Sequence, residues 1–384
     1  METKPLMHQH GGDLDAIERK YGIPKAEILD FSGNINPLGF PESVKTALAQ
    51  NLDIISTYPD KHYTALREAS GAYTGANPAH IVVGNGSTEL IGTFIKTVNA
   101  KKSLIMGPAY SEYEREVSLT GGTFDYFPLK AEDDFVIDLD ALLAALTPEI
   151  GMFVACNPNN PTGYLYTRKE MNRIRDLVKK YDLFLFSDEV YREFIYTGSP
   201  YISACHLEGI EQNVVLIDSV SKRYSECGIR IGALITKNRT LRNAVMKFCQ
   251  ARLSPPLIGQ IVAEASIDAP RSYSTEVYEE YIERRKCLID GLNRLPGVYS
   301  PIPMGAFYTV ARLPVEDSDD FCAWCLSDFD YEGETVMLAP ASGFYSDPAC
   351  GRNEVRIAYV LKKEDLERAL VVLGKALEAY NNRK

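Results

Sequence analysis

A lysine between small hydroxyl residues, followed by an arginine, marks the stretch of this chain best suited to covalent chemistry. Lys222 follows Ser219 and Ser221, just past the apolar run 214–217, which we interpret as a short buried strand. An amine that is desolvated or flanked by cations loses its proton more easily and attacks carbonyl groups. The natural carbonyl is the aldehyde of pyridoxal phosphate, whose phosphate Ser219, Ser221 and Arg230 would hold through hydroxyl and paired guanidinium donors. A solvated lysine in an ordinary turn is the alternative.

A glycine-rich segment, Gly84-Asn-Gly-Ser-Thr-Glu89, follows a predicted strand and opens a predicted helix. Its backbone N–H groups and the positive end of the helix form an anion site, and the glycines let the chain approach the anion closely. A plain helix cap and a nucleotide site are the alternatives. The dinucleotide-binding spacing Gly-x-Gly-x-x-Gly is not met, because Glu89 stands at its last position.

Two further motifs place polar side chains at predicted strand ends. Cys156-Asn-Pro-Asn-Asn-Pro-Thr-Gly163 contains two Asn-Pro steps, which force an irregular loop that can aim its amide side chains at a ligand. Ser187-Asp-Glu-Val-Tyr191 follows the next apolar run. There Asp188 could keep the pyridine nitrogen of a cofactor protonated and turn the ring into an electron sink. A helix cap or a surface acid is the ordinary alternative for Asp188.

The elements that must position these residues are short apolar runs alternating with segments of helical spacing. The runs lack polar alternation, which is typical of parallel strands covered on both faces. We therefore expect a large α/β domain over residues 50–280, and a smaller α+β domain formed by residues 1–49 and 281–384. Expected strands cover residues 81–83, 103–106, 151–155, 183–186, 214–217, 233–235, 305–310, 335–338 and 354–360. Expected helices cover residues 14–21, 90–98, 167–178 (with a capping box at Thr167 and Glu170), 275–295 and 363–380.

The composition of the 384 residues, with 45% hydrophobic and 24% charged, is typical of a soluble globular enzyme. A net charge of −11 opposes non-specific binding to nucleic acid or an anionic membrane, so we expect small-molecule partners. The chain shows no signal-peptide pattern and no run of eighteen apolar residues, which predicts a cytoplasmic protein. The eight cysteines are scattered, and Cys322-Ala-Trp-Cys325 has no second pair nearby, so we expect reduced thiols and no metal site.

Taken in order, Gly-x-Gly-Ser-x-Glu, Asn-Pro-x-Asn-Pro-Thr-Gly, Asp-Glu-x-Tyr and Ser-x-Ser-Lys-x7-Arg resemble the motifs of the class I/II aminotransferases, which are fold-type I pyridoxal-phosphate enzymes. The resemblance spans nearly the whole chain. It implies that Lys222 forms an imine with the cofactor and later moves a proton, and that Asp188 faces the pyridine nitrogen. Asn160 and Tyr191 would contact the ring's phenolic oxygen. The implied phosphate cup consists of Gly86, Ser87, Thr88, Ser219, Ser221 and Arg230.

The resemblance also implies contacts to the substrate and to a second subunit. Tyr110 resembles the residue that stacks on the cofactor ring, with a core tyrosine as the alternative. Tyr58 is similar to the tyrosine that reaches the phosphate of the neighbouring subunit, which implies a homodimer with shared active sites. Arg356 resembles the arginine that binds the substrate's α-carboxylate, although an arginine in a surface ion pair would look the same. Asn34 and Asn160 would contact the substrate as well, Asn34 from a segment that closes over it.

The expected reaction is a ping-pong transamination between an L-amino acid and a 2-oxo acid. The substrate stays open, because the motifs point to two groups of relatives. The segments from His10 and from Asp30 resemble threonine-phosphate decarboxylases and histidinol-phosphate aminotransferases, whereas residues 187–194, 219–225 and 338–345 resemble aspartate aminotransferase relatives. Arg252 lies near where some dicarboxylate-specific relatives bind the substrate side chain, although a structural arginine fits as well. Aspartate or a related acidic or aromatic amino acid is the candidate donor. Decarboxylation of an O-phospho amino acid, transamination of histidinol phosphate and a non-catalytic ligand-sensing module are the alternatives.

Overall fold

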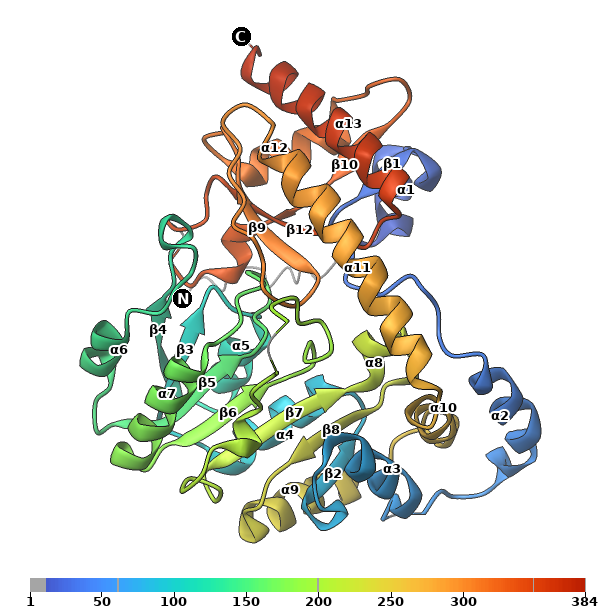
Figure 1. Cartoon of the computed structure of the whole chain (residues 1–384), viewed down its shortest axis with the longest axis vertical. Helices are drawn as coiled ribbons and strands as arrows, with labels where there is room; N and C mark the ends of the chain where they lie inside the picture. Colours follow the sequence, from blue (N-terminus) through green and yellow to red (C-terminus); the bar gives the residue numbers. More distant parts are fainter. Residues whose placement is uncertain (1–11, 61, 199, 348, 384) are drawn as a thin grey trace.

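A seven-stranded sheet organises the larger part of the chain (Figure 1). The computed structural model describes residues 12–60, 62–198, 200–347 and 349–383. Neighbouring strands of the sheet are parallel except for β8, which runs antiparallel to both of its neighbours. In their order across the sheet the strands are β2 (Ile81–Gly84), β8 (Gly232–Ile235), β7 (Val214–Ser219), β6 (Phe184–Asp188), β5 (Ile150–Cys156), β3 (Lys102–Gly107) and β4 (Thr123–Pro128).

The apolar runs of the sequence correspond to the buried strands of this sheet, and the predicted mostly parallel α/β sheet is confirmed. Six of its strands were expected, and all six are buried along most of their length. The edge strand β4 was not expected. It carries a mixture of polar and aromatic residues, of which only Phe127 is buried, so it lacks the continuous apolar run that marks the other strands.

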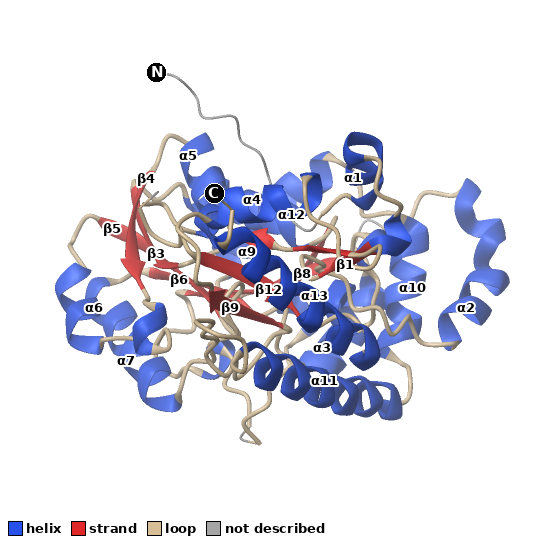
Figure 2. Cartoon of the chain, turned by 90° about the horizontal axis from the view of Figure 1, so that it is seen from above, coloured by secondary structure: helices blue, strands red, loops and turns tan. Residues whose placement is uncertain are grey.

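Helices cover both faces of the sheet (Figure 2). In α4 (Ser87–Val98) the buried residues include Leu90, Phe94 and Ile95, and this stripe packs on β7 and β8. The predicted capping box of α7 (Arg168–Tyr181) is present, with the Thr167 and Glu170 side chains bonded to each other's backbone N–H. The other helices of this part are α2 (Ser43–Asn51), α3 (Thr64–Thr74), α5 (Glu112–Leu119), α6 (Leu139–Ala145), α9 (Arg239–Ala251) and α10 (Leu257–Ile267).

The remaining elements form two small sheets with their helices. The first is antiparallel, in the order β11 (Ala339–Pro340), β12 (Glu354–Ala358) and β9 (Tyr308–Arg312). The second pairs β1 (Ile28–Asp30) in parallel with β10 (Thr335–Met337), which joins the N-terminal segment to the C-terminal part. The helices are α1 (Leu14–Tyr21), α11 (Arg271–Leu292), α12 (Ser318–Ser327) and α13 (Lys363–Asn381). The predicted domain boundaries fall inside α2 and α11, and the division into domains stays a prediction.

One hydrophobic core extends through both parts of the chain. Phe194, which follows β6, makes edge-to-face contacts with Tyr281 of α11 and with Phe307 next to β9, each at 5.1 Å between ring centroids. Such aromatic pairs stabilise a core beyond their area burial. The loop after β6 is therefore fixed against the smaller sheets. His10 and Gly11 begin one of the two N-terminal segments whose resemblance to known enzymes is described above, and they lie outside the described residues.

Within the described ranges, no helix is both long enough and apolar enough to span a bilayer. Nor do the described histidine, cysteine and acidic side chains form a cluster of three or more that could hold a metal ion. All eight cysteines are free, and both members of the Cys322–Cys325 pair are buried in α12.

Candidate active site

A cavity of about 250 Å³ lies where β5, β6 and β7 end side by side. The carboxyl edge of parallel strands is the usual place for a ligand in an α/β sheet. The structure brings twelve of the residues singled out from the sequence to its wall: Asn34, Ser87, Thr88, Tyr110, Asn160, Asp188, Tyr191, Ser219, Ser221, Lys222, Arg230 and Arg356. Gly86 adjoins this wall, while Tyr58 and Arg252 do not line it within this chain.

Lys222 lies in a one-turn helix, α8 (Val220–Arg223), directly after the predicted strand. The turn forms because the Ser219 hydroxyl accepts a hydrogen bond from the Ser221 N–H at 3.1 Å and so caps it. The Nζ atom of Lys222 donates to the backbone carbonyl of Asn34 at 2.6 Å. Asn36 in turn donates to the Lys222 carbonyl at 3.4 Å, so the N-terminal segment lies directly against the lysine.

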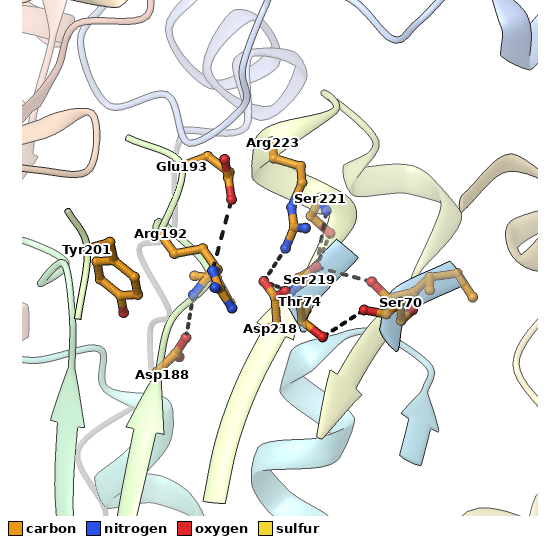
Figure 3. Close-up of polar contacts among 12 residues, drawn as sticks. Ser70, Thr74, Asp188, Arg192, Glu193, Tyr201, Asp218, Ser219, Ser221 and Arg223 are labelled. Carbon is orange, nitrogen blue, oxygen red and sulfur yellow. Dashed lines mark hydrogen bonds and ion pairs between the residues drawn. The ribbon is translucent and has the colours of Figure 1, made fainter. Parts of the chain in front are cut away.

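A buried ion pair beneath this turn holds α8 in place (Figure 3). Asp218, at the end of β7, accepts a hydrogen bond from the guanidinium of Arg223, the residue next to Lys222. Arg223 also lies over the ring of Tyr73, 4.2 Å from its centroid. Both charged side chains are about 5% exposed, so removing either partner would leave an uncompensated buried charge. Arg223 therefore points away from the cavity and anchors the turn that presents Lys222.

The start of α4 and the turn at Arg230 form a cup for an anion. No side chain caps the N-terminus of α4, so the backbone N–H groups near Ser87 and Thr88 keep their donors for a ligand. Gly86 has φ +84°, and a Cβ there would collide with the guanidinium of Arg230. A Cβ on Gly232 would lie 2.5 Å from the Ser87 nitrogen. Only glycine allows this close approach, which brings a cation against the open helix end.

Arg252 is held in an ion pair outside the cavity. Its Nη2 donates to Glu89 Oε2 at 2.6 Å, and a second oxygen of Glu89 accepts from its Nε. Glu89 also accepts a hydrogen bond from the Asn85 N–H at 2.7 Å, which fixes the glycine-rich turn. Within this chain Arg252 therefore supports the anion cup through Glu89 and does not reach a substrate side chain.

Asp188 lies at the floor of the cavity and is buried. Burial raises the pKa of Asp188 to about 6, and the hydrogen bond from the Tyr113 hydroxyl, at 2.7 Å, opposes this rise. Tyr113 also makes an edge-to-face contact with Tyr110 at 5.6 Å. The sequence analysis assigned no role to Tyr113. Its place three residues after Tyr110 was the available signal, because a turn at this spacing brings the two residues together, and the Tyr113 N–H donates to the Tyr110 carbonyl at 3.2 Å.

Arg356, on β12, is 1% exposed and bounds the cavity from the smaller sheet. Its Nη2 donates to the Ser32 carbonyl at 2.9 Å, and its Nη1 donates to Asn160 Oδ1 at 3.3 Å. Its Nε has no hydrogen-bond partner among the described residues. A buried guanidinium with a free donor needs an anion, so this position suits the carboxylate of a ligand.

Tyr308 is a second cavity residue without an assignment from the sequence. The guanidinium of Arg356 lies over its ring at 4.5 Å, and its hydroxyl is 3.1 Å from that of Tyr191. Arg356 pairs with Val310 across β12 and β9, so Tyr308 stands two residues away on the same face. This register is decided by strand pairing and could not be read from the sequence.

The residues present fit pyridoxal phosphate. The uncapped helix end with Arg230 suits a phosphate, and Asp188 suits a pyridine nitrogen at the buried end of the ring. Tyr110 offers an aromatic face, and Lys222 offers an amine within the same cavity. Tyr58 is 88% exposed, and its contact with a neighbouring subunit stays a prediction.

Comparisons with known proteins agree with this site. The family model described as aminotransferase class I and II matches residues 26–373. Threonine-phosphate decarboxylase of Salmonella typhimurium is 35% identical over 310 residues, which cover 81% of this chain and 83% of that protein. Aspartate aminotransferase of Pyrococcus horikoshii is 27% identical over 88% of each chain. The solved aspartate aminotransferase of Thermus thermophilus shares the fold, with a TM-score of 0.84 over 95% of this chain and 96% of that one at 22% identity.

The family match covers most of the chain, and the first of these relatives exceeds 30% identity over four fifths of it. The fold match is to the fold-type I enzymes, and this chain has the mostly parallel central sheet of that fold. The chain therefore belongs to the class I and II aminotransferase family, the fold-type I enzymes that depend on pyridoxal phosphate.

Proposed function

We propose that this chain is an aminotransferase that moves an amino group from an L-amino acid to a 2-oxo acid in two half-reactions. The observation that carries the proposal is the position of Arg356 in the cavity that also contains Lys222. Arg356 donates to Asn160 Oδ1, so an α-carboxylate bound by Arg356 is held beside Asn160. With the carboxylate held there, the hydrogen on Cα, and not the carboxylate, is left for the amine of Lys222.

In this proposal each polar group has one task. When bound, pyridoxal phosphate supplies an aldehyde and an electron-withdrawing ring that stores the electron pair released at Cα. Asp188 would hold a negative charge near the ring nitrogen, and Tyr110 would offer its aromatic face to the ring. Lys222 takes the proton from Cα and holds it on Nζ, while Arg356 grips the α-carboxylate with parallel N–H donors. Ser87, Thr88, Ser219, Ser221 and Arg230 would hold the cofactor phosphate, and the absence of a side chain at Gly86 lets Arg230 lie against the start of α4.

The described lining supports no preference for an acidic substrate side chain. Its cations are Lys222, Arg230 and Arg356, and each already has a task. A second anionic group on the substrate would need a cation from another subunit or from residues outside the described ranges. Ile35 and the tyrosines of the wall leave apolar and aromatic contacts for the side chain.

A homodimer with shared active sites is part of the proposal. The segment from residue 35 to residue 58 begins at the cavity and exposes several large apolar side chains, which a second copy of the chain would cover. The exposed residues are Ile35, Leu38, Phe40, Leu52, Ile55 and Tyr58. Light scattering should give twice the mass of the chain, and a monomer at working concentration would argue against shared sites.

We also propose that the protein works in the cytoplasm. Its eight cysteines are all free, which suits a reducing compartment. Its expected partners there are small molecules, namely amino acids and 2-oxo acids. The net charge of −11 disfavours binding to nucleic acid.

Decarboxylation of an O-phospho amino acid is the second candidate. The observation in its favour is the 35% identity with a threonine-phosphate decarboxylase, which exceeds the 27% identity with an aspartate aminotransferase. Both reactions use the same cofactor and differ in which substituent of Cα is released. The orientation of the substrate on Arg356 decides between them.

Two measurements test the proposal. Borohydride reduction of the cofactor-loaded protein followed by peptide mapping should place the label on Lys222, and a label on another residue would end the proposal. The loaded enzyme is then mixed with aspartate, aromatic amino acids and O-phosphothreonine. Conversion of the cofactor to its amine form, seen as a loss of the aldehyde absorbance, supports transamination. Release of carbon dioxide from O-phosphothreonine without that conversion supports decarboxylation.

A further inference from the structure

A second cavity, of about 260 Å³, lies on the sheet away from the active site. It shares no lining residue with the active-site cavity. Ser219, at one end of β7, lines the first cavity, whereas Val214, at the other end, lines the second. The body of the second cavity is apolar, formed by Val214, Leu216, Ile235 and Leu207. Its volume is near the lower limit of roughly 300 Å³ for small-molecule sites.

Four basic side chains line this cavity, namely Arg192, Lys237, His80 and His206, against one acid, Glu211. Burial lowers the pKa of His206, and the charges of Arg192 and Lys237 lower it further. Burial and the charge of Lys237 likewise lower the pKa of His80. Lys237 therefore lies close enough to oppose protonation of both imidazoles, and Arg192 acts on His206 in the same way.

Arg192 is the least exposed of the charged groups at this cavity, with 14% of its side chain accessible. Its guanidinium lies 5.6 Å from the ring centroid of Tyr201 (Figure 3). Its nearest carboxylate is that of Glu193, with 4.0 Å between Nε and Oε1, which is beyond hydrogen-bond distance. Arg192 donates no side-chain hydrogen bond to any residue within the described ranges. A half-enclosed guanidinium thus keeps its donors for a ligand.

The other carboxylates whose charges act on Arg192, those of Asp218 and Glu189, form no hydrogen bond with its guanidinium within the described ranges. Asp218 forms the buried ion pair with Arg223. Glu189 accepts hydrogen bonds on Oε1 from the Ser187 and Ser203 hydroxyls, at 3.0 and 3.1 Å, and from the Ala204 N–H, while its Oε2 has no hydrogen-bond partner among the described residues. These carboxylates compensate the charge of Arg192 at a distance but do not saturate its N–H groups. An anion could therefore bind Arg192 without displacing an existing hydrogen bond.

We propose that this cavity binds a small organic dianion. One anionic group contacts Arg192, the apolar body of the ligand lies along β7 and β8, and the second anionic group contacts Lys237 with His80 and His206. Either carboxylate or phosphate groups satisfy these donors, because both accept paired N–H bonds from a guanidinium. The site is independent of the reaction proposed for the first cavity, since the two cavities have no residue in common.

Histidine NMR titration of the cofactor-loaded protein tests the proposal directly, because the chain has only five histidines. Succinate, butyrate and inorganic phosphate serve as probes for a dicarboxylate, the matched monocarboxylate and a phosphate. An anion beside an imidazole favours its charged form, so binding should raise the pKa of His80 and His206 and leave His62 unchanged. This rise in the pKa of His80 and His206 should saturate with increasing succinate or phosphate. The probe that saturates it at the lower concentration shows whether the site prefers carboxylate or phosphate groups.

Variants separate this site from the active site. Arg192→Gln and Lys237→Gln should each weaken the saturable response by about tenfold, corresponding to the loss of a charged contact. Lys247→Gln, which removes an exposed charge outside the cavity, is the matched control and should leave the response unchanged. Arg356→Gln removes the proposed carboxylate contact of the first cavity and should also leave the saturable response of His80 and His206 unchanged. If Arg192→Gln does not fold, Lys237→Gln, at an exposed position, carries the test.

Three outcomes would overturn the proposal. The first is the absence of a saturable response of His80 and His206 to succinate and to phosphate. The second is an equal response to butyrate, which would exclude the dianion. The third is loss of the response in Arg356→Gln, which would place the binding in the active site.

Discussion

Replacing Arg356 with glutamine removes the guanidinium at the proposed substrate end of the active site. The structure shows Arg356 buried, with hydrogen bonds to Ser32 and Asn160 and a free Nε. Glutamine keeps an amide donor near these acceptors but loses the charge and the paired N–H groups. We expect the substrate's α-carboxylate to be held more weakly and the cofactor to be held as before, because Arg356 lies outside the phosphate cup.

The size of the effect follows from the burial of Arg356. Truncating one partner of a buried, hydrogen-bonded charge pair costs about 2–5 kcal/mol. A loss of about 3 kcal/mol corresponds to a fall of about 150-fold in kcat/KM. Arg356→Lys keeps the charge without the planar fork, so we expect it to fall between the wild type and Arg356→Gln.

The assay follows the rate at which an amino acid converts the cofactor to its amine form, for each variant and over a range of substrate concentrations. Arg352→Gln is the matched control, because Arg352 has a 60% exposed side chain and, among the described residues, forms its ion pair with Asp317. Its kcat/KM should equal that of the wild type. An unchanged kcat/KM in Arg356→Gln, or a loss of cofactor absorbance in proportion to the loss of activity, would refute the assignment of Arg356 to the substrate.

Three further changes test other parts of the structure. Burial raises the pKa of Asp188 from 3.8 to about 6, so the cofactor-free protein should lose up to about 3 kcal/mol of stability as pH rises through this window. Urea unfolding of the cofactor-free protein at several pH values should show that Asp188→Asn removes this loss. Equal pH dependence of the unfolding free energy in both proteins would contradict the reasoning. Tyr58→Phe should raise the dissociation constant of the cofactor by about tenfold, because it removes a hydrogen bond to a charged phosphate. An absorbance titration measures this constant, and the mass of the dimer should stay unchanged. An unaltered dissociation constant would exclude the shared site. Thr167→Ala should lower the free energy of unfolding by about 1 kcal/mol, because it removes half of the capping box of α7. If the midpoint of urea unfolding does not shift, this cap contributes little to stability.

Much of the active site could be predicted from the sequence because its residues follow strand ends. Asp188 ends β6, and Ser219 ends β7 just before Lys222. The carboxyl ends of adjacent parallel strands meet at one edge of a sheet, so local patterns were enough to place these residues together. The helix Leu14–Tyr21 and the capping box at Thr167 could also be predicted, because each depends only on neighbours within a few residues.

Other features depend on contacts between segments far apart in the chain, and these became visible only in the folded structure. Tyr308 meets Arg356 through the register of β9 and β12, and Arg252 pairs with Glu89 across 163 residues. The second cavity likewise collects Arg192, Lys237 and two histidines from separate segments of the chain. Hydrophobic periodicity indicates which residues are buried, but it does not say which buried surfaces face one another. Packing of the whole chain decides that, because many pairings of the same apolar faces bury similar areas and only one satisfies all the polar groups between them.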